Sequence, residues 1–70
     1  MTAKELLTKL EDERARLMNR VEEFDLKYQG CLATGDQAGA DYYKTATDMV
    51  RRRLFDFIIA IQIIKDRLGD

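Results

Sequence analysis

Apolar side chains recur along this chain in two series, each with alternating spacings of four and three residues. The first series is Ala3, Leu7, Leu10, Arg14, Leu17, Val21, Phe24, Tyr28 and Cys31, and the second is Ala40, Tyr43, Thr47, Val50, Leu54, Phe57, Ile61, Ile64 and Leu68. We call these the seam residues, because such spacing places every member on one side of an α-helix, as in a coiled coil. The chain is therefore predicted to be all-α, with two amphipathic helices.

The two ends of the chain carry residues that are typical of helix termini. Thr2 followed by Glu5 is a capping box, in which the threonine hydroxyl accepts a hydrogen bond from an amide of the first turn. Near the other end, Lys65 and Arg67 complement the helix dipole. Gly69 is predicted to take the left-handed conformation that ends many helices.

The middle of the chain carries the signal for a tight turn. Gly35 suits the position that directly follows the end of a helix, and Asp36 suits the N-cap position of the next helix. The predicted helices cover about residues 3–34 and about residues 37–68. Gly30 leaves open an earlier end to the first helix and a longer loop.

A turn at this place pairs the two seams in antiparallel order. Residues that face each other should then have numbers that add up to about 71. Every layer obeys this rule, from Cys31 with Ala40 beside the turn to Ala3 with Leu68 at the open end. We expect residues 1–70 to form a single antiparallel coiled-coil hairpin of two helices.

Part of the apolar surface has no place between two helices. The positions beside the seam are expected to bury Leu6, Met18, Leu32, Ala46, Ile58 and Ala60. Phe55, Ile59 and Ile63 are spaced four residues apart, so they form a ridge on the outer side of the second helix, which we expect Met49 and Tyr42 to continue towards the turn. Soluble monomers seldom expose such a patch. The hairpin is therefore predicted to complete a larger helical assembly, with Met49, Phe55, Ile59 and Ile63 binding a partner chain.

Charge changes this interpretation little. The net charge is −1, with 36% charged residues. In this register, three consecutive arginines of the second helix, Arg51, Arg52 and Arg53, lie near Arg16 and Arg20 of the first. These arginines could form an electrostatic patch that binds an acidic protein or RNA. Alternatively, they are solvated or pair locally with nearby carboxylates, namely Glu13, Glu22, Glu23 or Asp25. We do not expect nucleic acid to be the partner, because no aromatic stacking residues lie among the arginines. Arg14, the one charged seam residue, is expected to fix the register rather than to bind a ligand.

The residue types needed for catalysis or metal binding are scarce. The chain has no histidine and one cysteine, Cys31, which excludes an internal disulfide and argues against a zinc site. Cys31 faces the seam without a basic neighbour that would lower its pKa. We therefore predict no enzymatic activity, no metal and no cofactor. The apolar stretch 54–64 contains Asp56 and Gln62 and is too short for a bilayer, so we expect a soluble protein. The single thiol suits a reducing compartment, so we expect this protein to be cytoplasmic.

Two motifs carry a resemblance to a known family. The turn Ala33-Thr34-Gly35-Asp36 and the run from Phe57 to Ile64, with its alternation of small and branched apolar residues, resemble the YscE-type small helical-hairpin co-chaperones of bacterial type III secretion. The resemblance covers mainly residues 33–69. It implies a bacterial virulence role in the cytoplasm. There the hairpin would bind a small tetratricopeptide-repeat-like chaperone, and the pair would hold the needle subunit in a ternary complex.

Two other functions also fit the hairpin. One is a homodimeric four-helix-bundle regulator, a class that includes RNA-binding proteins, and the other is a coiled-coil adaptor. A homodimer is also expected when the chain has no other partner.

Overall fold

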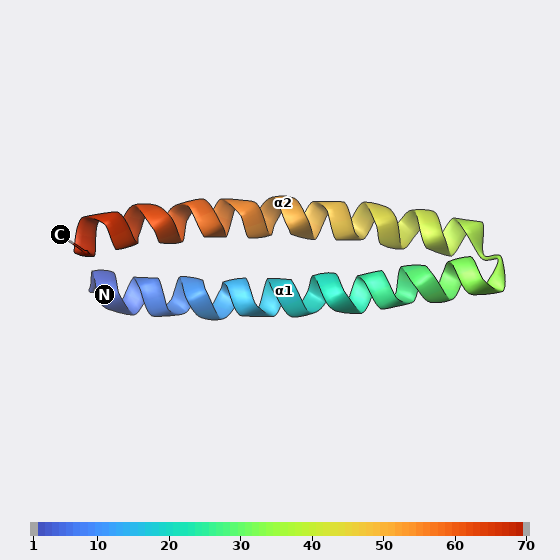
Figure 1. The fold of residues 1–70 in the computed structure, drawn as a ribbon, viewed down its shortest axis with the longest axis horizontal. Coiled ribbons are helices and arrows are strands. Elements are labelled where there is room, and N and C mark those ends of the chain that lie inside the picture. The colour runs from blue at the N-terminus through green and yellow to red at the C-terminus, as the bar shows by residue number, and fades with distance from the viewer. Residues whose placement is uncertain (1, 70) are drawn as a thin grey trace.

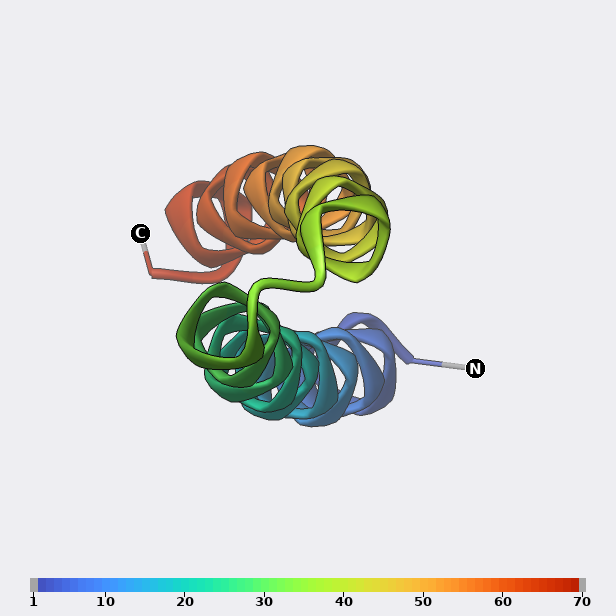
Figure 2. The ribbon, with the colours of Figure 1, turned by 90° about the vertical axis from the view of Figure 1, so that its right-hand side faces the viewer.

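Two long antiparallel helices make up the computed structural model, which describes residues 2–69 (Figure 1). Helix α1 spans Ala3–Thr34 and helix α2 spans Gln37–Leu68, and the two pack against each other. These bounds agree with those predicted from the capping residues, and α1 runs through Gly30 without a break. The start of α1 and the end of α2 lie at the same end of a rod that measures 52 × 17 × 14 Å (Figure 1). Figure 2 looks along this rod with the turn nearest the viewer.

The turn between the helices is closed by backbone hydrogen bonds at one glycine. Gly35 has φ of 76°, a left-handed conformation that costs glycine little. Its amide donates to the carbonyl of Leu32 at 3.3 Å, and the amide of Asp36 donates to the carbonyl of Cys31 at 2.8 Å. This pair of bonds is the Schellman motif, which satisfies the free carbonyls at the end of a helix. The direction of α2 is therefore set within two residues of the end of α1.

The outer ends of the helices are capped in different ways. The Thr2 hydroxyl accepts a hydrogen bond from the Glu5 amide at 3.1 Å, as predicted. The prediction for Gly69 is wrong, because this residue has φ of −77° and ψ of −7°, in the right-handed region. Its amide donates to the carbonyl of Lys65 at 2.7 Å. Gly69 thus continues the last helical turn, and this geometry requires no left-handed residue.

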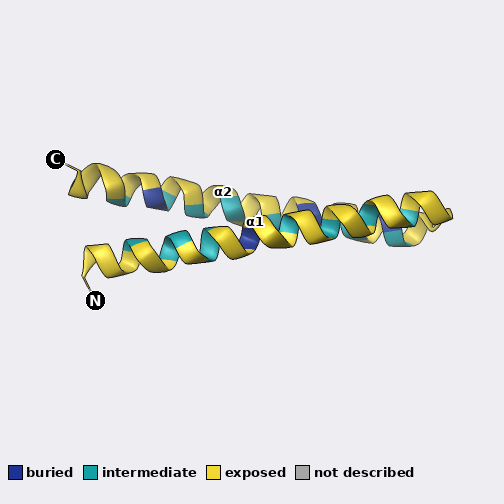
Figure 3. Cartoon of the chain, turned by 60° about the horizontal axis from the view of Figure 1, so that its bottom comes forward, coloured by how far each residue is buried: buried dark blue, intermediate teal, exposed yellow. Residues whose placement is uncertain are grey.

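The core is a narrow stripe along the seam (Figure 3). Within residues 2–69, the buried side chains are Leu17, Ala40, Thr47 and Ile61. The other seam residues are half-buried, except for the exposed Ala3 and Leu68 at the open end. Thr47 is the buried polar residue, and its hydroxyl donates to the carbonyl of Tyr43 at 2.7 Å. Two helices therefore bury one another only along a single line of contact.

The positions beside the seam are more exposed than predicted. Ala46 and Ala60 are half-buried, as expected. The prediction was wrong for the larger side chains at such positions, since Leu6, Met18, Leu32 and Ile58 are each between 40% and 50% exposed. The reason is geometric, because two packed helices cover the line between them and leave the adjoining positions open on one side. Covering those positions requires a third helix.

Candidate protein-interaction surface

An apolar ridge runs along the outer side of α2. Phe55, Ile59 and Ile63 are 61%, 43% and 50% exposed, and we call these three residues the α2 ridge. Successive members are four residues apart, so each lies about 40° further around the helix than the last. The exposed Ile58 follows Phe55 by three residues and widens the ridge on one side. These four large side chains form one continuous surface in the C-terminal half of α2.

The hairpin cannot cover the α2 ridge with its own residues. Helix α1 packs against the side of α2 that carries Leu54, Phe57 and Ile61, which are half-buried or buried. A helix has a diameter of about 10 Å, so a neighbour on one side leaves the opposite side in solvent. The turn lies at the far end of the rod, and within residues 2–69 α1 is the one element that packs against α2 (Figure 1). The α2 ridge is therefore exposed in the isolated chain, as the sequence predicted.

Met49 and Tyr42 do not continue the α2 ridge, and this part of the prediction was wrong. Met49 precedes Phe55 by six residues, which is about 240° around the helix, so the two side chains leave α2 on different sides. Met49 and Tyr42 instead line a groove of about 310 Å³ between the helices, together with Arg20, Phe24, Thr45, Ala46 and Val50. Met49 is exposed, but it belongs to a second apolar surface.

An aromatic cluster that was not predicted from the sequence contributes Phe24 and Tyr42 to the lining of this groove. The ring centroids of Phe24 and Tyr43 are 6.0 Å apart, and those of Tyr42 and Tyr43 are 5.1 Å apart. The Lys27 Nζ lies 5.7 Å from the Tyr43 ring centroid, within the range of a cation–π interaction. The adjacent pair Tyr42-Tyr43 was the signal in the sequence that could have predicted this cluster. Tyr43 is a seam residue and Tyr42 lines the groove.

The three consecutive arginines do not form one surface. Adjacent residues of a helix leave its axis about 100° apart. Arg53 lines a depression with Arg20, Leu17, Met49 and Val50, whereas Arg51 lies in a separate groove near Asp25, Lys44 and Asp48. Arg52 is exposed and precedes Phe55 by three residues, which places it at the end of the α2 ridge. The three arginines therefore lie in three different environments, and they cannot all contact one flat partner surface.

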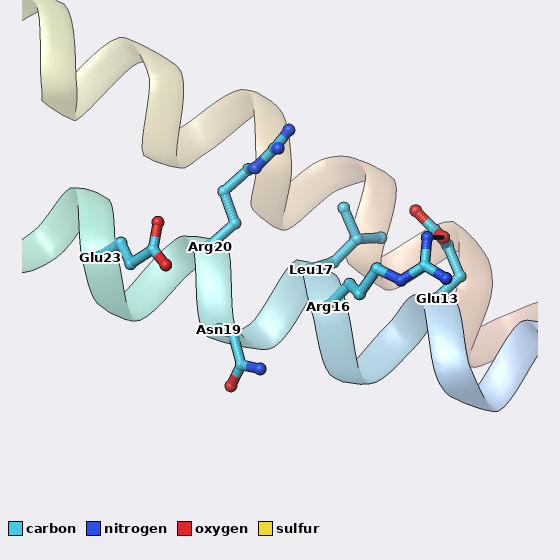
Figure 4. A pocket seen from close by; sticks show the side chains of 6 residues that line it. All are labelled: Glu13, Arg16, Leu17, Asn19, Arg20 and Glu23. Atoms are coloured by element: carbon cyan, nitrogen blue, oxygen red, sulfur yellow. Dashed lines mark hydrogen bonds and ion pairs between the residues drawn. The ribbon is translucent and has the colours of Figure 1, made fainter.

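A polar depression of about 330 Å³ lies along α1 (Figure 4). Arg16 Nη1 donates to Glu13 Oε2 at 3.2 Å, and this is the one ion pair within residues 2–69. Figure 4 shows Arg20 extending towards α2 while Asn19 points away from the depression. Because both signs of charge line the depression and Glu13 is already paired with Arg16, the depression does not concentrate charge on a ligand. Arg16 thus pairs locally, which is what one of the two sequence interpretations predicted for it.

A further exposed apolar residue lies on α1. Leu26 is 72% exposed, the largest exposed fraction among the large apolar side chains of the described residues. Its neighbours on the same side of the helix are Glu22, Glu23, Gln29 and Gly30, none of them apolar. Its exposure could have been predicted from the sequence, because Leu26 is a leucine that does not fit the seam spacing. Leu26 is a single exposed residue and not part of a patch.

The Cys31 thiol lies beside the turn and is held in its protonated form. Partial burial raises the pKa of Cys31, and the Asp36 carboxylate raises this pKa further through its charge and as a hydrogen-bond acceptor. A raised pKa lowers the fraction of thiolate, which is the nucleophile and metal ligand. Within the described residues, no group of three metal-binding side chains comes together. The surface offers apolar contact and isolated charges, which suit the binding of a macromolecule.

Comparisons with known proteins do not extend this description. No family model, curated protein or solved structure matches this chain. Neither helix, over the residues described, has an apolar stretch long enough to cross a bilayer.

Proposed function

We propose that this chain is a protein-binding module that uses the α2 ridge to pack against helices of another polypeptide. The observation that carries the proposal is the exposure of Phe55, Ile59 and Ile63 on one side of α2. Transfer of each such side chain from water to a protein interior contributes about 1.5–3 kcal/mol. A helix added along the ridge would gain about half of this contribution from each side chain, because these residues are 43% to 61% exposed in the hairpin.

The slenderness of the rod supports the same proposal. A compact protein of 8.1 kDa exposes about 4,500 Å². This hairpin exposes 5447 Å², and no large side chain among the described residues is fully buried. A domain of this size has little core to stabilise it alone, and small helical proteins commonly gain the remainder by association. Binding to a partner would therefore stabilise the fold as well as occupy the ridge.

The resemblance gives the proposal its specific form. We infer a cytoplasmic co-chaperone that stabilises a tetratricopeptide-repeat-like chaperone of the type III secretion needle subunit. Support comes from the overlap between the run Phe57–Ile64, which carries the resemblance, and the exposed part of α2. An amphipathic helix laid into a groove of stacked repeat helices is a common mode of recognition. No catalytic step belongs to this function.

Co-expression with the repeat-containing chaperone and the needle subunit of the same organism tests the proposal. Phe55→Asp places a charge within the α2 ridge, at its most exposed residue, and should abolish co-purification. Leu26→Asp is the matched control, because Leu26 is at least as exposed but lies alone on α1. Far-UV circular dichroism should show unchanged helicity for both variants. Retention of the chaperone by Phe55→Asp, at the level seen for Leu26→Asp, would contradict the proposal.

A further inference from the structure

The outer side of α2 has apolar residues spaced evenly about Ile59 and opposite charges at its two ends. Phe55 and Ile63 lie four residues before and after Ile59, and Arg52 and Asp66 lie seven residues before and after it. Seven residues are almost two helical turns, so Arg52, Ile59 and Asp66 lie nearly in one line along the helix. Phe55 and Ile63 lie about 40° to either side of that line. All five side chains are exposed.

We propose that two copies of this chain pair through this side of α2, with the two α2 helices antiparallel and the two-fold axis at Ile59. A two-fold axis perpendicular to the helices places Ile59 opposite its own copy. It also brings Phe55 of one copy to the level of Ile63 of the other, on opposite sides of the contact line. Each large side chain then fills the space beside its counterpart, as in the packing of coiled-coil helices.

Charge selects this orientation over the parallel one. In the antiparallel pair, Arg52 of each copy lies at the level of Asp66 of the other, so two ion pairs close the two ends of the apolar contact. A parallel pair would instead place arginine beside arginine and aspartate beside aspartate. Arg52 makes no hydrogen bond or ion pair with another residue of the described chain. Its guanidinium is thus available for a second copy.

The remaining polar groups at this surface are compatible with the pairing. Asp66 Oδ1 accepts a hydrogen bond from Gln62 Nε2 at 2.9 Å, which leaves the second carboxylate oxygen for Arg52 of the other copy. Asp56 and Gln62 lie three residues before and after Ile59, about 60° to either side of the line through Ile59, so Asp56 of one copy lies at the level of Gln62 of the other but at the opposite edge of the contact. No like charges meet along the contact line.

The surface of the hairpin also matches the needs of such a dimer. The exposed area of 5447 Å² exceeds that of a compact protein of this mass by about 900 Å², and each partner in an interface of ordinary size buries about 800 Å². The contact from Arg52 to Asp66 is about 21 Å long. This inference rests on the proposed use of the α2 ridge as an interface, and it names a second copy as the occupant when no other partner is bound.

A charge exchange tests the orientation directly. Sedimentation velocity over a range of concentrations should show that the native chain is a dimer. Arg52→Asp and Asp66→Arg should each weaken dimerisation by about tenfold or more, because each places two pairs of like charges across the interface. The double variant Arg52→Asp with Asp66→Arg should restore most of the affinity. Arg53→Asp is the matched control and should leave the dimer unchanged, because Arg53 faces the groove on the α1 side.

A cross-link tests the position of the two-fold axis. In a Cys31→Ser background, Ile59→Cys should form an intermolecular disulfide under mild oxidation, whereas Thr45→Cys should not. Thr45 is an exposed α2 residue fourteen residues before Ile59, so in the antiparallel pair its counterpart in the second copy is about 42 Å away along the helix.

Clear outcomes would overturn the inference. These are a monomeric native chain, single charge variants that dimerise as tightly as the native chain, and a charge exchange that restores nothing. Failure of the inference can be told apart from failure of the proposed function. A monomer whose capture of the chaperone is lost with Phe55→Asp would overturn only the dimer. A dimer that obeys the charge exchange, but never retains the chaperone, would overturn only the co-chaperone role.

Discussion

The amide of Gly39 donates a 2.9 Å hydrogen bond to Oδ1 of Asp36, and the Asp36 carboxylate occupies the space where a side chain at position 39 would begin. A Cβ atom built on Gly39 would lie 2.9 Å from Asp36 Cγ and 2.8 Å from Cys31 Sγ. The N-cap of α2 and the last turn of α1 therefore share one crowded site. Gly39 is needed here for close approach, whereas Gly35 is needed for its positive φ.

Gly39→Ala should destabilise the chain by about 1–2 kcal/mol, because moving the Asp36 side chain removes the cap, and this loss outweighs the better helix propensity of alanine. Gly30→Ala is the control. Gly30 lies inside α1 with nothing within 4 Å of an added Cβ. This change should stabilise the chain by about 0.5–1 kcal/mol. Urea unfolding at one fixed protein concentration measures both variants, and equal effects of the same sign would contradict this account of the turn.

Asp36→Asn should make the Cys31 thiol more reactive. Asparagine caps a helix about as well as aspartate but carries no charge, so the pKa of Cys31 should fall towards its ordinary value. The pH profile of alkylation by iodoacetamide should therefore shift to lower pH in this variant. Alkylation of the unfolded chain in urea is the control, because there the two proteins should react alike. An unchanged profile in the folded variant would show that Asp36 does not act on the thiol.

The raised pKa of Cys31 also predicts how stability depends on pH. The folded chain keeps the thiol proton to a higher pH than the unfolded chain does. The resulting contribution to stability is fully present below the unfolded pKa and is lost as the pH rises through the folded pKa. The hairpin should therefore lose stability in alkaline solution, and Cys31→Ser should reduce that loss. Urea midpoints measured across the alkaline range provide the comparison.

Arg14→Leu should raise the stability of the hairpin by about 1 kcal/mol or more, because an apolar side chain would replace the one charge in the seam. Arg14 is half-buried, and it has no hydrogen bond or ion pair with the rest of the described chain. Arg16→Leu is the control, since Arg16 is exposed and its pair with Glu13 is worth little in solvent. We expect that control to change the stability by less than about 0.5 kcal/mol. A destabilised Arg14→Leu variant would mean that the arginine makes a contribution of its own to the fold.

The sequence by itself determined the two helices, their bounds and their antiparallel packing. The reason is that caps, turn residues and seam spacing act within a few residues of one another. The Asp36 cap and the left-handed Gly35 need no distant partner to take their conformations. Gly69 shows the limit of such signals, since a glycine permits a left-handed ending but does not require it.

Only the tertiary structure decided how far the apolar and charged side chains around the seam are covered. Ile58 and Met18 looked buried by their positions, but one neighbouring helix covers too little of its partner to hide them. The separation of Met49 from the α2 ridge followed already from helical geometry, while its place in a groove with Phe24 depended on where α1 lies. The separation of Arg51, Arg52 and Arg53 likewise followed from the rotation of about 100° per residue, while the grooves that Arg51 and Arg53 line depended on the position of α1. The burial of a side chain depends on the shapes of both helices at their contact. The spacing of apolar residues along one helix shows which side of that helix is apolar, but not how much of that side its neighbour covers.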